Sequence, residues 1–466
     1  MFKKYIGTKQ FYQGVIYVAV PIIIQNVITN FVSLLDNIMV GQVGTEQMAA
    51  VSVANQLLFV FYCGMGGITM GASVLGSQFF GNNDNKGVAH TFKVKFILGL
   101  VFLGICMFSF TVWGDELLKL FLHESDDGLD VAATFVYAKD YMKVILTCLP
   151  LFMITQCYAS TLRDIKETRL PMIAGLCAVF VNLLFNYILI YGKFGFPEMG
   201  IVGAAVATNI SRVVEVGICV IWTHTHPEKL EFPKYIFKEL RIPKETFRKA
   251  TILALPTLVN EILWSAGMST INQSLSMRGV AVVSATNITS VVLLVSKSVF
   301  IGMGISLAII VGNALGSGDL ELAVDSDRKM IALIFAITFV LAVICFFCAP
   351  VLPLLYNTTD GVRALATKFI RISSILMPTD CLMNAFYHTI KSGGNPLITF
   401  LYDGGYTWTI EVPFALILGH LTNMPVVPMY ALVYGINYIK VAAGLIMVKK
   451  KIWVRTLVGE NKEKPV

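Results

Sequence analysis

Long apolar stretches separated by short polar ones dominate the pattern of this chain. A bilayer core about 30 Å thick needs roughly 20 apolar residues per helix, and the charge-poor runs supply about twelve such segments. The runs lack the short alternating strands of an outer-membrane barrel, so we expect helices. The predicted spans are 11–40, 48–80, 88–113, 133–162, 171–191, 201–222, 251–276, 282–314, 330–355, 363–390, 396–419 and 428–448.

A charged segment divides these spans into two groups of six. Residues 223–250, THTHPEKLEFPKYIFKELRIPKETFRKA, contain three prolines and many charges, which is typical of a connector outside the membrane. We therefore predict an all-α integral membrane protein with two pseudo-symmetric six-helix lobes. The N-lobe would span 1–222, the cytoplasmic linker 223–250, the C-lobe 251–448 and a cytoplasmic tail 449–466.

The two groups repeat each other when the chain is shifted by 235 residues. The residues that then superpose without gaps are Pro21 on Pro256, Asn37 on Asn272, Gly44 on Gly279, Gly67 on Gly302, Gly81 on Gly316 and Asp84 on Asp319. Proline in an opening helix and glycine at turns fix the backbone shape, so these matches matter more than the weak overall identity. Each half has an even number of spans, which predicts parallel lobes with a transport site between them.

Composition and charge agree with a membrane protein. The chain is 56% hydrophobic and 14% charged, with a mean hydropathy of +0.72, whereas soluble domains carry about 25% charged residues. The net charge of +7 does not indicate a nucleic-acid partner, because the basic residues collect in alternate loops. These are Lys3, Lys4 and Lys9, then Arg163, Lys166 and Arg169, then Lys229 to Lys249, and finally Lys449, Lys450, Lys451 and Arg455. The positive-inside rule then predicts a multi-pass protein of the plasma membrane with both termini cytoplasmic.

The candidate chemistry begins with Asp36, a carboxylate inside the apolar opening segment. A charged Asp at the centre of a membrane helix costs about 2.5 to 3.5 kcal/mol on insertion scales, so such residues usually face a polar cavity. Counted from the helix ends, Asn186 and Thr208 lie at the depth of Asp36, and Asn182 precedes Asn186 by one turn. These oxygens could bind a small cation such as sodium or hold a protonated carboxyl. Alternatively, Asp36 only hydrogen-bonds the two amides and holds helices together.

The second half places its intramembrane acids, Glu261 and Asp380, differently. At the offset of 235, Glu261 falls on Asn26, so the acids do not follow the repeat and the fold alone does not demand them. Lys297 lies mid-membrane on the eighth span and could neutralise one of them. A structural salt bridge between Lys297 and Glu261 is the alternative. Arg212 and Glu215 lie three positions apart on the sixth span and are expected to pair. Glu411 and Lys440 could pair across the eleventh and twelfth spans.

Five segments, in chain order, carry a recognisable pattern. They are VPIIIQNVITNFVSLLDNIMVGQVG (Val20 to Gly44), MAAVSVANQ (Met48 to Gln56), GITMGASVLGSQFFGNND (Gly67 to Asp84), YASTLRDIKETRLPMI (Tyr158 to Ile173) and GIVGAAVAT (Gly200 to Thr208). With these segments the chain resembles the multidrug and toxic compound extrusion (MATE) family over nearly its whole length. The resemblance implies an outward-facing V of two six-helix lobes that exports cationic, amphiphilic compounds by antiport with protons or sodium ions.

The resemblance also implies two sites. It places a first-lobe cation site on the positions of Asp36, Asn182, Asn186, Thr208 and Tyr141. The family members best known for this site carry a second acid where this chain has Asn186, which favours proton coupling here. A second-lobe cation or drug site falls on Glu261 and Asp380, where a tyrosine expected one turn before Asp380 is replaced by Leu376.

Other functional classes find less support. The sequence contains no HExxH, GxSxG or Walker A motif, so we do not expect an enzyme or an ATP-driven pump. We expect no metal site, since His224 and His226 lack further ligands, and no cofactor apart from a coupling proton or sodium ion. A lipid-linked saccharide flippase of the same superfamily is the alternative, but its phosphates would need a cavity rich in Arg and Lys. We therefore predict a monomeric, cation-coupled antiporter of organic cations, surrounded by membrane lipids and working by alternating access.

Overall fold

The protein is described by a computed structural model that covers residues 2–120, 130–228, 230–238, 241–356 and 358–458. Within these ranges every regular element is a helix, which confirms the predicted all-α fold. Nine helices there are long and apolar enough to cross a bilayer, and a bent pair makes a tenth. The end of the predicted tail, residues 459–466, lies outside the described residues.

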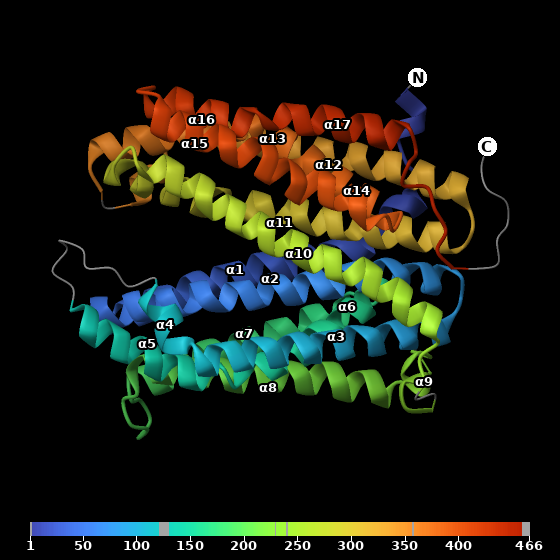
Figure 1. Ribbon diagram of the computed structural model, residues 1–466, viewed down its shortest axis with the longest axis horizontal. Helices are drawn as coiled ribbons and strands as arrows, with labels where there is room; N and C mark the ends of the chain where they lie inside the picture. The colour runs from blue at the N-terminus through green and yellow to red at the C-terminus, as the bar shows by residue number, and fades with distance from the viewer. Residues whose placement is uncertain (1, 121–129, 229, 239–240, 357, 459–466) are drawn as a thin grey trace. The chain divides into compact units, whose positions relative to one another are not determined.

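The helices follow the predicted spans (Figure 1). The long helices before the linker are α1 (Lys9–Gly41), α2 (Thr45–Gly81), α3 (Asn85–Val112), α5 (Val131–Ile145), α6 (Cys148–Asp164), α7 (Arg169–Ile190) and α8 (Gly200–Thr225). Those after it are α10 (Lys244–Ser276), α11 (Val280–Gly316), α12 (Leu320–Cys348), α13 (Asp360–Ser392), α15 (Val412–Leu421), α16 (Val426–Gly435) and α17 (Asn437–Lys449). The short elements are η1 (Phe2–Tyr5), α4 (Gly114–Lys119), α9 (Pro233–Lys238), η2 (Leu352–Leu355), α14 (Pro396–Phe400) and the π-helical η3 (Leu401–Gly405) and η4 (Thr407–Glu411).

Four predicted spans differ from the structure. The span 396–419 contains α14, the π-helical η3 and η4, and α15, and the span 428–448 is interrupted between α16 and α17. The span 133–162 is broken into α5 and α6, which bend by 48°. Pro150 explains the break, because proline has no N–H to donate and its ring clashes with the carbonyl of the residue four positions earlier. The span predicted to begin at residue 330 begins at Leu320, because an apolar window does not detect the charged first turns of a helix.

The predicted repeat is visible in two helix caps. The side chain of Asp84 accepts a hydrogen bond from Gly87 N at 2.8 Å and caps α3. Its counterpart Asp319 accepts one from Leu322 N, also at 2.8 Å, and caps α12. The two caps have nearly the same backbone angles, φ −94° and ψ 83° against φ −86° and ψ 85°. These two equivalent positions in the halves of the chain therefore both cap the N-terminus of a helix.

We expect Asp84→Ala and Asp319→Ala each to destabilise the protein by about 1 kcal/mol, the usual cost of losing a helix N-cap. Thermal unfolding of the purified protein in detergent measures this loss. Asp84→Ser and Asp319→Ser are the controls, since serine can cap a helix as well. A serine variant as unstable as its alanine counterpart would contradict the capping role.

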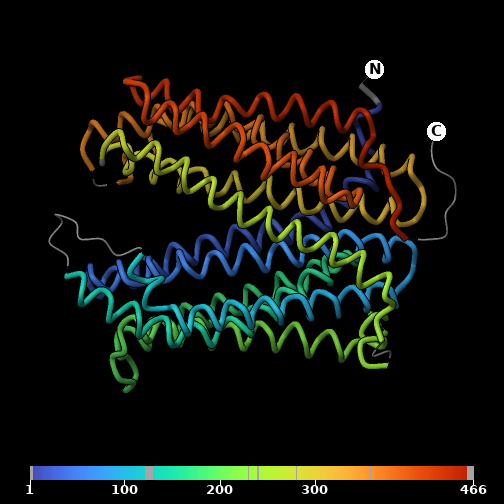
Figure 2. The backbone as a smooth tube through the Cα atoms, in the orientation of Figure 1, coloured from blue at the N-terminus to red at the C-terminus, as the bar shows by residue number. Residues whose placement is uncertain are grey.

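The chain forms two compact units whose boundaries cut through helices. The C-terminal unit comprises Met1–Ile23, Ser77–Asn83 and Val259–Val466, and the N-terminal unit comprises Ile24–Gly76 and Asp84–Leu258. The boundaries after Ile23 and after Leu258 are equivalent in the repeat of 235 residues. The first part of α1 thus belongs with the second half of the sequence, and the first part of α10 belongs with the first half. Within each unit the long helices run side by side (Figure 2).

We call the first part of α1, up to Ile23, and the first part of α10, up to Leu258, the exchanged segments. Glycines allow these segments to pack closely. In the C-terminal unit, a Cβ on Gly302 would lie 2.8 Å from Ile23 Cγ1. In the N-terminal unit, a Cβ on Gly67 would lie 2.4 Å from Leu258 Cα. Gly67 and Gly302 are equivalent in the repeat, and so are Ile23 and Leu258. The same small-residue contact therefore holds the start of one long helix in each unit.

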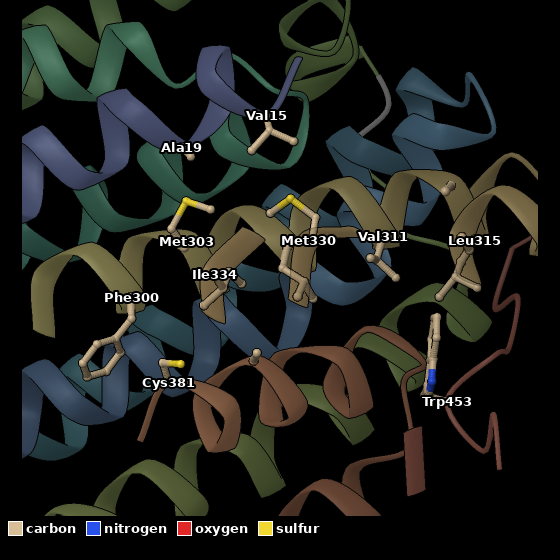
Figure 3. Close-up of a cluster of buried hydrophobic side chains, with 14 residues drawn as sticks. Val15, Ala19, Phe300, Met303, Val311, Leu315, Met330, Ile334, Cys381 and Trp453 are labelled. Atoms are coloured by element: carbon tan, nitrogen blue, oxygen red, sulfur yellow. The ribbon is translucent and has the colours of Figure 1, made fainter. Parts of the chain in front are cut away.

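A buried apolar cluster joins the start of α1 to helices of the C-terminal unit (Figure 3). Val15 and Ala19 of α1 pack with side chains from α11, α12 and α13, among them Met303 and Ile334. All four of these residues are buried. In a bilayer such side chains hold helices together by van der Waals packing, so the start of α1 is part of this core.

A buried ion pair lies in the N-terminal unit. Lys95 Nζ of α3 is 2.7 Å from Asp164 Oδ2 at the end of α6, and the two side chains are 0% and 3% exposed. The ammonium also donates to the hydroxyls of Ser73, Ser160 and Thr161 at 2.8, 3.1 and 3.2 Å. The pair is thus fully hydrogen-bonded in a place that water does not reach.

Candidate cation sites

The first site joins three helices of the N-terminal unit. Asp36 lies near the end of α1, Asn182 and Asn186 lie one turn apart on α7, and Thr208 lies on α8. Asn186 Nδ2 donates to Asp36 Oδ1 at 2.6 Å and to Asn182 Oδ1 at 3.2 Å. Asn182 Nδ2 lies 3.3 Å from Thr208 Oγ1. The structure therefore brings together four of the five residues expected from the sequence.

The amides of this site have a preferred orientation and one unused atom. Turning the Asn182 amide places its nitrogen 2.9 Å from Asp36 Oδ1 and satisfies both of its polar atoms better, so both amides then donate to the carboxylate. In this orientation the Asn182 oxygen faces the Thr208 hydroxyl, and the bond from Asn186 to Asn182 is not formed. Within the described residues, Asn186 Oδ1 is buried and has no hydrogen-bond partner. A buried acceptor beside a carboxylate is a position where a proton donor or a cation would be bound favourably.

Tyr141 and Arg212 border this site. Tyr141 is only 6% exposed and lies close enough to Asp36 to act on it electrostatically, although no hydrogen bond between them is among those of the described residues. Arg212, one turn after Thr208, also acts on Asp36. Its guanidinium is 2.5 Å from Glu215, which confirms the pair expected from the sequence. The sequence alone did not indicate that Arg212 lies within electrostatic range of Asp36, although its position one turn after Thr208 was a usable signal.

The acids of the C-terminal unit have partners other than those expected. Glu261 Oε1 accepts a hydrogen bond from Tyr387 Oη at 2.8 Å, so the missing tyrosine before Asp380 is matched by a hydroxyl two turns after it. Lys391 is the cation that acts on Glu261. Lys297 is exposed and acts on Asp380, and no ion pair joins it to Glu261 in the described part of the chain. The structural Lys297–Glu261 salt bridge is therefore not found.

A third acid was missed in the sequence. Lys440 Nζ lies 3.8 Å from Glu411 Oε1, which confirms the suggested pair, but its closer partner is Asp403 Oδ1 at 2.8 Å. Asn260, next to Glu261 on α10, donates to Asp403 Oδ2 at 2.9 Å. Asp403 lies in the apolar run 396–419, so the criterion that singled out Asp36 would have found it too.

Comparison with known proteins identifies the family. The profile of the MatE family matches residues 21–188 and 256–417, one match in each half of the chain. A protein named "Probable multidrug resistance protein NorM" from Thermotoga maritima is 27% identical over 426 residues, which cover 90% of this chain and 88% of that protein. "Probable multidrug resistance protein YoeA" from Bacillus subtilis is 24% identical and covers 87% of each chain.

Solved structures agree on the fold. One, described as an outward-facing conformation of a multidrug resistance MATE family transporter of the MOP superfamily, matches with a TM-score of 0.83 over 95% of this chain and 96% of that chain. Its sequence identity is 18%, so it supports the fold alone. Because the family profile covers most of both halves, this multi-pass membrane protein belongs to the MatE family of transporters and is not an enzyme.

Proposed function

We propose that this transporter exports organic cations and amphiphilic drugs by antiport with a coupling cation, through alternating access. The observation that carries the proposal is the site around Asp36, where a carboxylate in a membrane helix meets two amides and the neighbouring Thr208 hydroxyl. The relatives from Thermotoga maritima and Bacillus subtilis, both named as probable multidrug resistance proteins, support a drug-like cargo. We also propose a monomer in the plasma membrane, with both termini cytoplasmic and two six-helix lobes surrounded by lipid.

Mutual exclusion at Asp36 would couple the two flows. A carboxylate that holds a proton has no charge with which to attract a cationic cargo, and one that faces a cargo cation has no room for another cation. Binding of either species then weakens binding of the other, which is a coupling free energy in the thermodynamic sense. The amide donors of α7 favour the ionised carboxylate, so protonation would weaken the link between α1 and α7.

We propose a proton rather than sodium as the coupling ion. Sodium needs several oxygen ligands and gains from a second negative charge, whereas this site has one carboxylate. The second acid that the resemblance to the MATE family led us to expect is replaced here by Asn186. Arg212 lies within electrostatic range and also disfavours a bound metal cation. A proton needs only the carboxyl itself.

Proteoliposomes test the choice of ion. With ethidium as cargo, we expect a pH gradient to drive transport at zero sodium, and a sodium gradient at constant pH to give no transport above protein-free liposomes. A proton ionophore should abolish the pH-driven flux. Transport driven by sodium alone would overturn proton coupling, and no gradient-driven transport under either condition would overturn antiport itself.

A further inference from the structure

The ammonium of Lys440 lies in a cage of two carboxylates and two aromatic rings in the C-terminal unit. Its nitrogen is 2.8 Å from Asp403 Oδ1 and 3.8 Å from Glu411 Oε1. It lies 5.7 Å from the ring centre of Tyr402 and 5.5 Å from that of Tyr406. Carboxylates and ring faces are the groups that bind ammonium ions in proteins, so this is a complete cation environment.

The cage is held in place by groups other than Lys440. Asn260 donates to Asp403 Oδ2 at 2.9 Å, and its own oxygen accepts from Gly404 N, also at 2.9 Å. Thr407 Oγ1 donates to Glu411 Oε2 at 3.1 Å. Each carboxylate therefore has a donor that would remain if the ammonium left. The arrangement is pre-organised for a positive charge rather than collapsed around one lysine.

The backbone around the cage is irregular on both sides. Asp403 and Glu411 each belong to a π-helical segment, Leu401–Gly405 and Thr407–Glu411. Lys440 follows the interruption between α16 and α17, where Tyr406 Oη donates to Ile436 O at 2.9 Å. π-Helical turns occur frequently at functional sites, and irregular backbone within a membrane is tolerated where it lines a polar site.

An unused acceptor lies on the same helix as Lys440. Asn437 precedes Lys440 by three positions on α17 and so shares its helix face. The residue is 8% exposed, and its Oδ1 is buried without a hydrogen-bond partner among the described residues. The helix face that carries Lys440 therefore also carries an oxygen for which the described residues supply no donor.

We infer that the cage of Asp403, Glu411, Tyr402 and Tyr406 is a site for a monovalent cation, and that the ammonium of Lys440 occupies it as a tethered substitute for an exchangeable ion. The side chains of Lys440, Asp403 and Glu411 are 6%, 14% and 5% exposed, so without a cation two buried carboxylates would face each other. The C-terminal unit therefore neutralises these acids without taking up an ion. The inference concerns binding and does not depend on coupling at Asp36.

Removing the lysine should create an ion site. In the full-length protein carrying Asp36→Asn, so that the N-terminal unit cannot contribute, we expect Lys440→Ala to bind radioactive sodium saturably in equilibrium dialysis. Sodium chloride, compared with choline chloride, should raise its unfolding temperature in the same concentration range, as binding to the folded state requires. Propylammonium should compete with sodium because it reproduces the lost side chain. The Asp36→Asn protein with Lys440 intact should show none of these effects.

Lys95→Ala in the same background is the matched control, because it also removes a buried, paired lysine but leaves a single carboxylate, Asp164. We expect no sodium binding there, and none when Asp403→Asn is added to Lys440→Ala. A Lys440→Ala protein that folds without cations and binds no more sodium than Lys95→Ala overturns the inference. If Lys440→Ala folds only when sodium or propylammonium is present during purification, the inference is supported. If it fails to fold with either cation, while Lys440→Ala with Asp403→Asn and Glu411→Gln folds, it is overturned.

Discussion

Asp36→Asn is expected to reduce gradient-driven ethidium transport to the level of protein-free liposomes while the protein stays folded. Asparagine has nearly the shape of aspartate and can still bond the amides of Asn182 and Asn186, which lie 2.9 and 2.6 Å from the carboxylate in the preferred orientation. It has no ionisable group, however, so it cannot exchange a proton. Transport in proteoliposomes with a pH gradient measures the loss, and thermal unfolding in detergent checks the fold.

Asp36→Glu is the matched control, since it keeps a carboxyl group and should retain measurable transport. The comparison separates coupling from structure, because a purely structural Asp36 would be replaced well by asparagine and poorly by the longer glutamate. Transport by Asp36→Asn at the wild-type rate would therefore contradict the coupling role. It would indicate that Asp36 only forms hydrogen bonds to α7.

Asp164→Asn is expected to destabilise the protein by about 3 to 5 kcal/mol, the usual cost of removing one partner of a buried ion pair. The substitution leaves the Lys95 ammonium, whose side chain is 0% exposed, with only neutral partners. Three hydroxyls would still accept hydrogen bonds, but they cannot balance the charge. Thermal unfolding and the yield of folded protein after extraction measure the effect.

Two variants make this result specific. Asp115→Asn breaks the Lys139–Asp115 pair, whose side chains are 43% and 44% exposed, and should cost at most about 1 kcal/mol. Lys95→Met combined with Asp164→Leu replaces the buried pair by apolar side chains and should recover most of the stability. An Asp164→Asn protein as stable as Asp115→Asn would show that the charge of Lys95 is compensated elsewhere.

Much of the fold could be predicted from the sequence because the membrane demands it. Apolar length alone gives the spans, and the caps at Asp84 and Asp319 show that a few shape-determining residues are enough to detect the repeat. Depth counting and the four-residue spacing of Asn182 and Asn186 also sufficed to bring the Asp36 cluster together. These inferences rest on local geometry, which one sequence contains.

The remaining features depend on which helices pack together, and hydropathy does not report that. Nothing in the sequence shows that Tyr387, rather than a residue before Asp380, supplies the hydroxyl for Glu261. Nor does it show that Lys440 prefers Asp403 to Glu411, because both acids lie on the same span. Long-range pairs of this kind require the three-dimensional arrangement, and here they decide which acids have a cation.

The exchange of helix starts has a consequence for biogenesis. Gly71 packs where a Cβ would lie 2.5 Å from Leu253 O, so α2 meets a backbone that the ribosome makes only after the linker. When the spans before the linker have been inserted, one face of α2 therefore still lacks its packing partner, α10. Cotranslational assembly of the two units is interlocked, and a chain terminated before the linker would lack the segment that closes its own N-terminal unit.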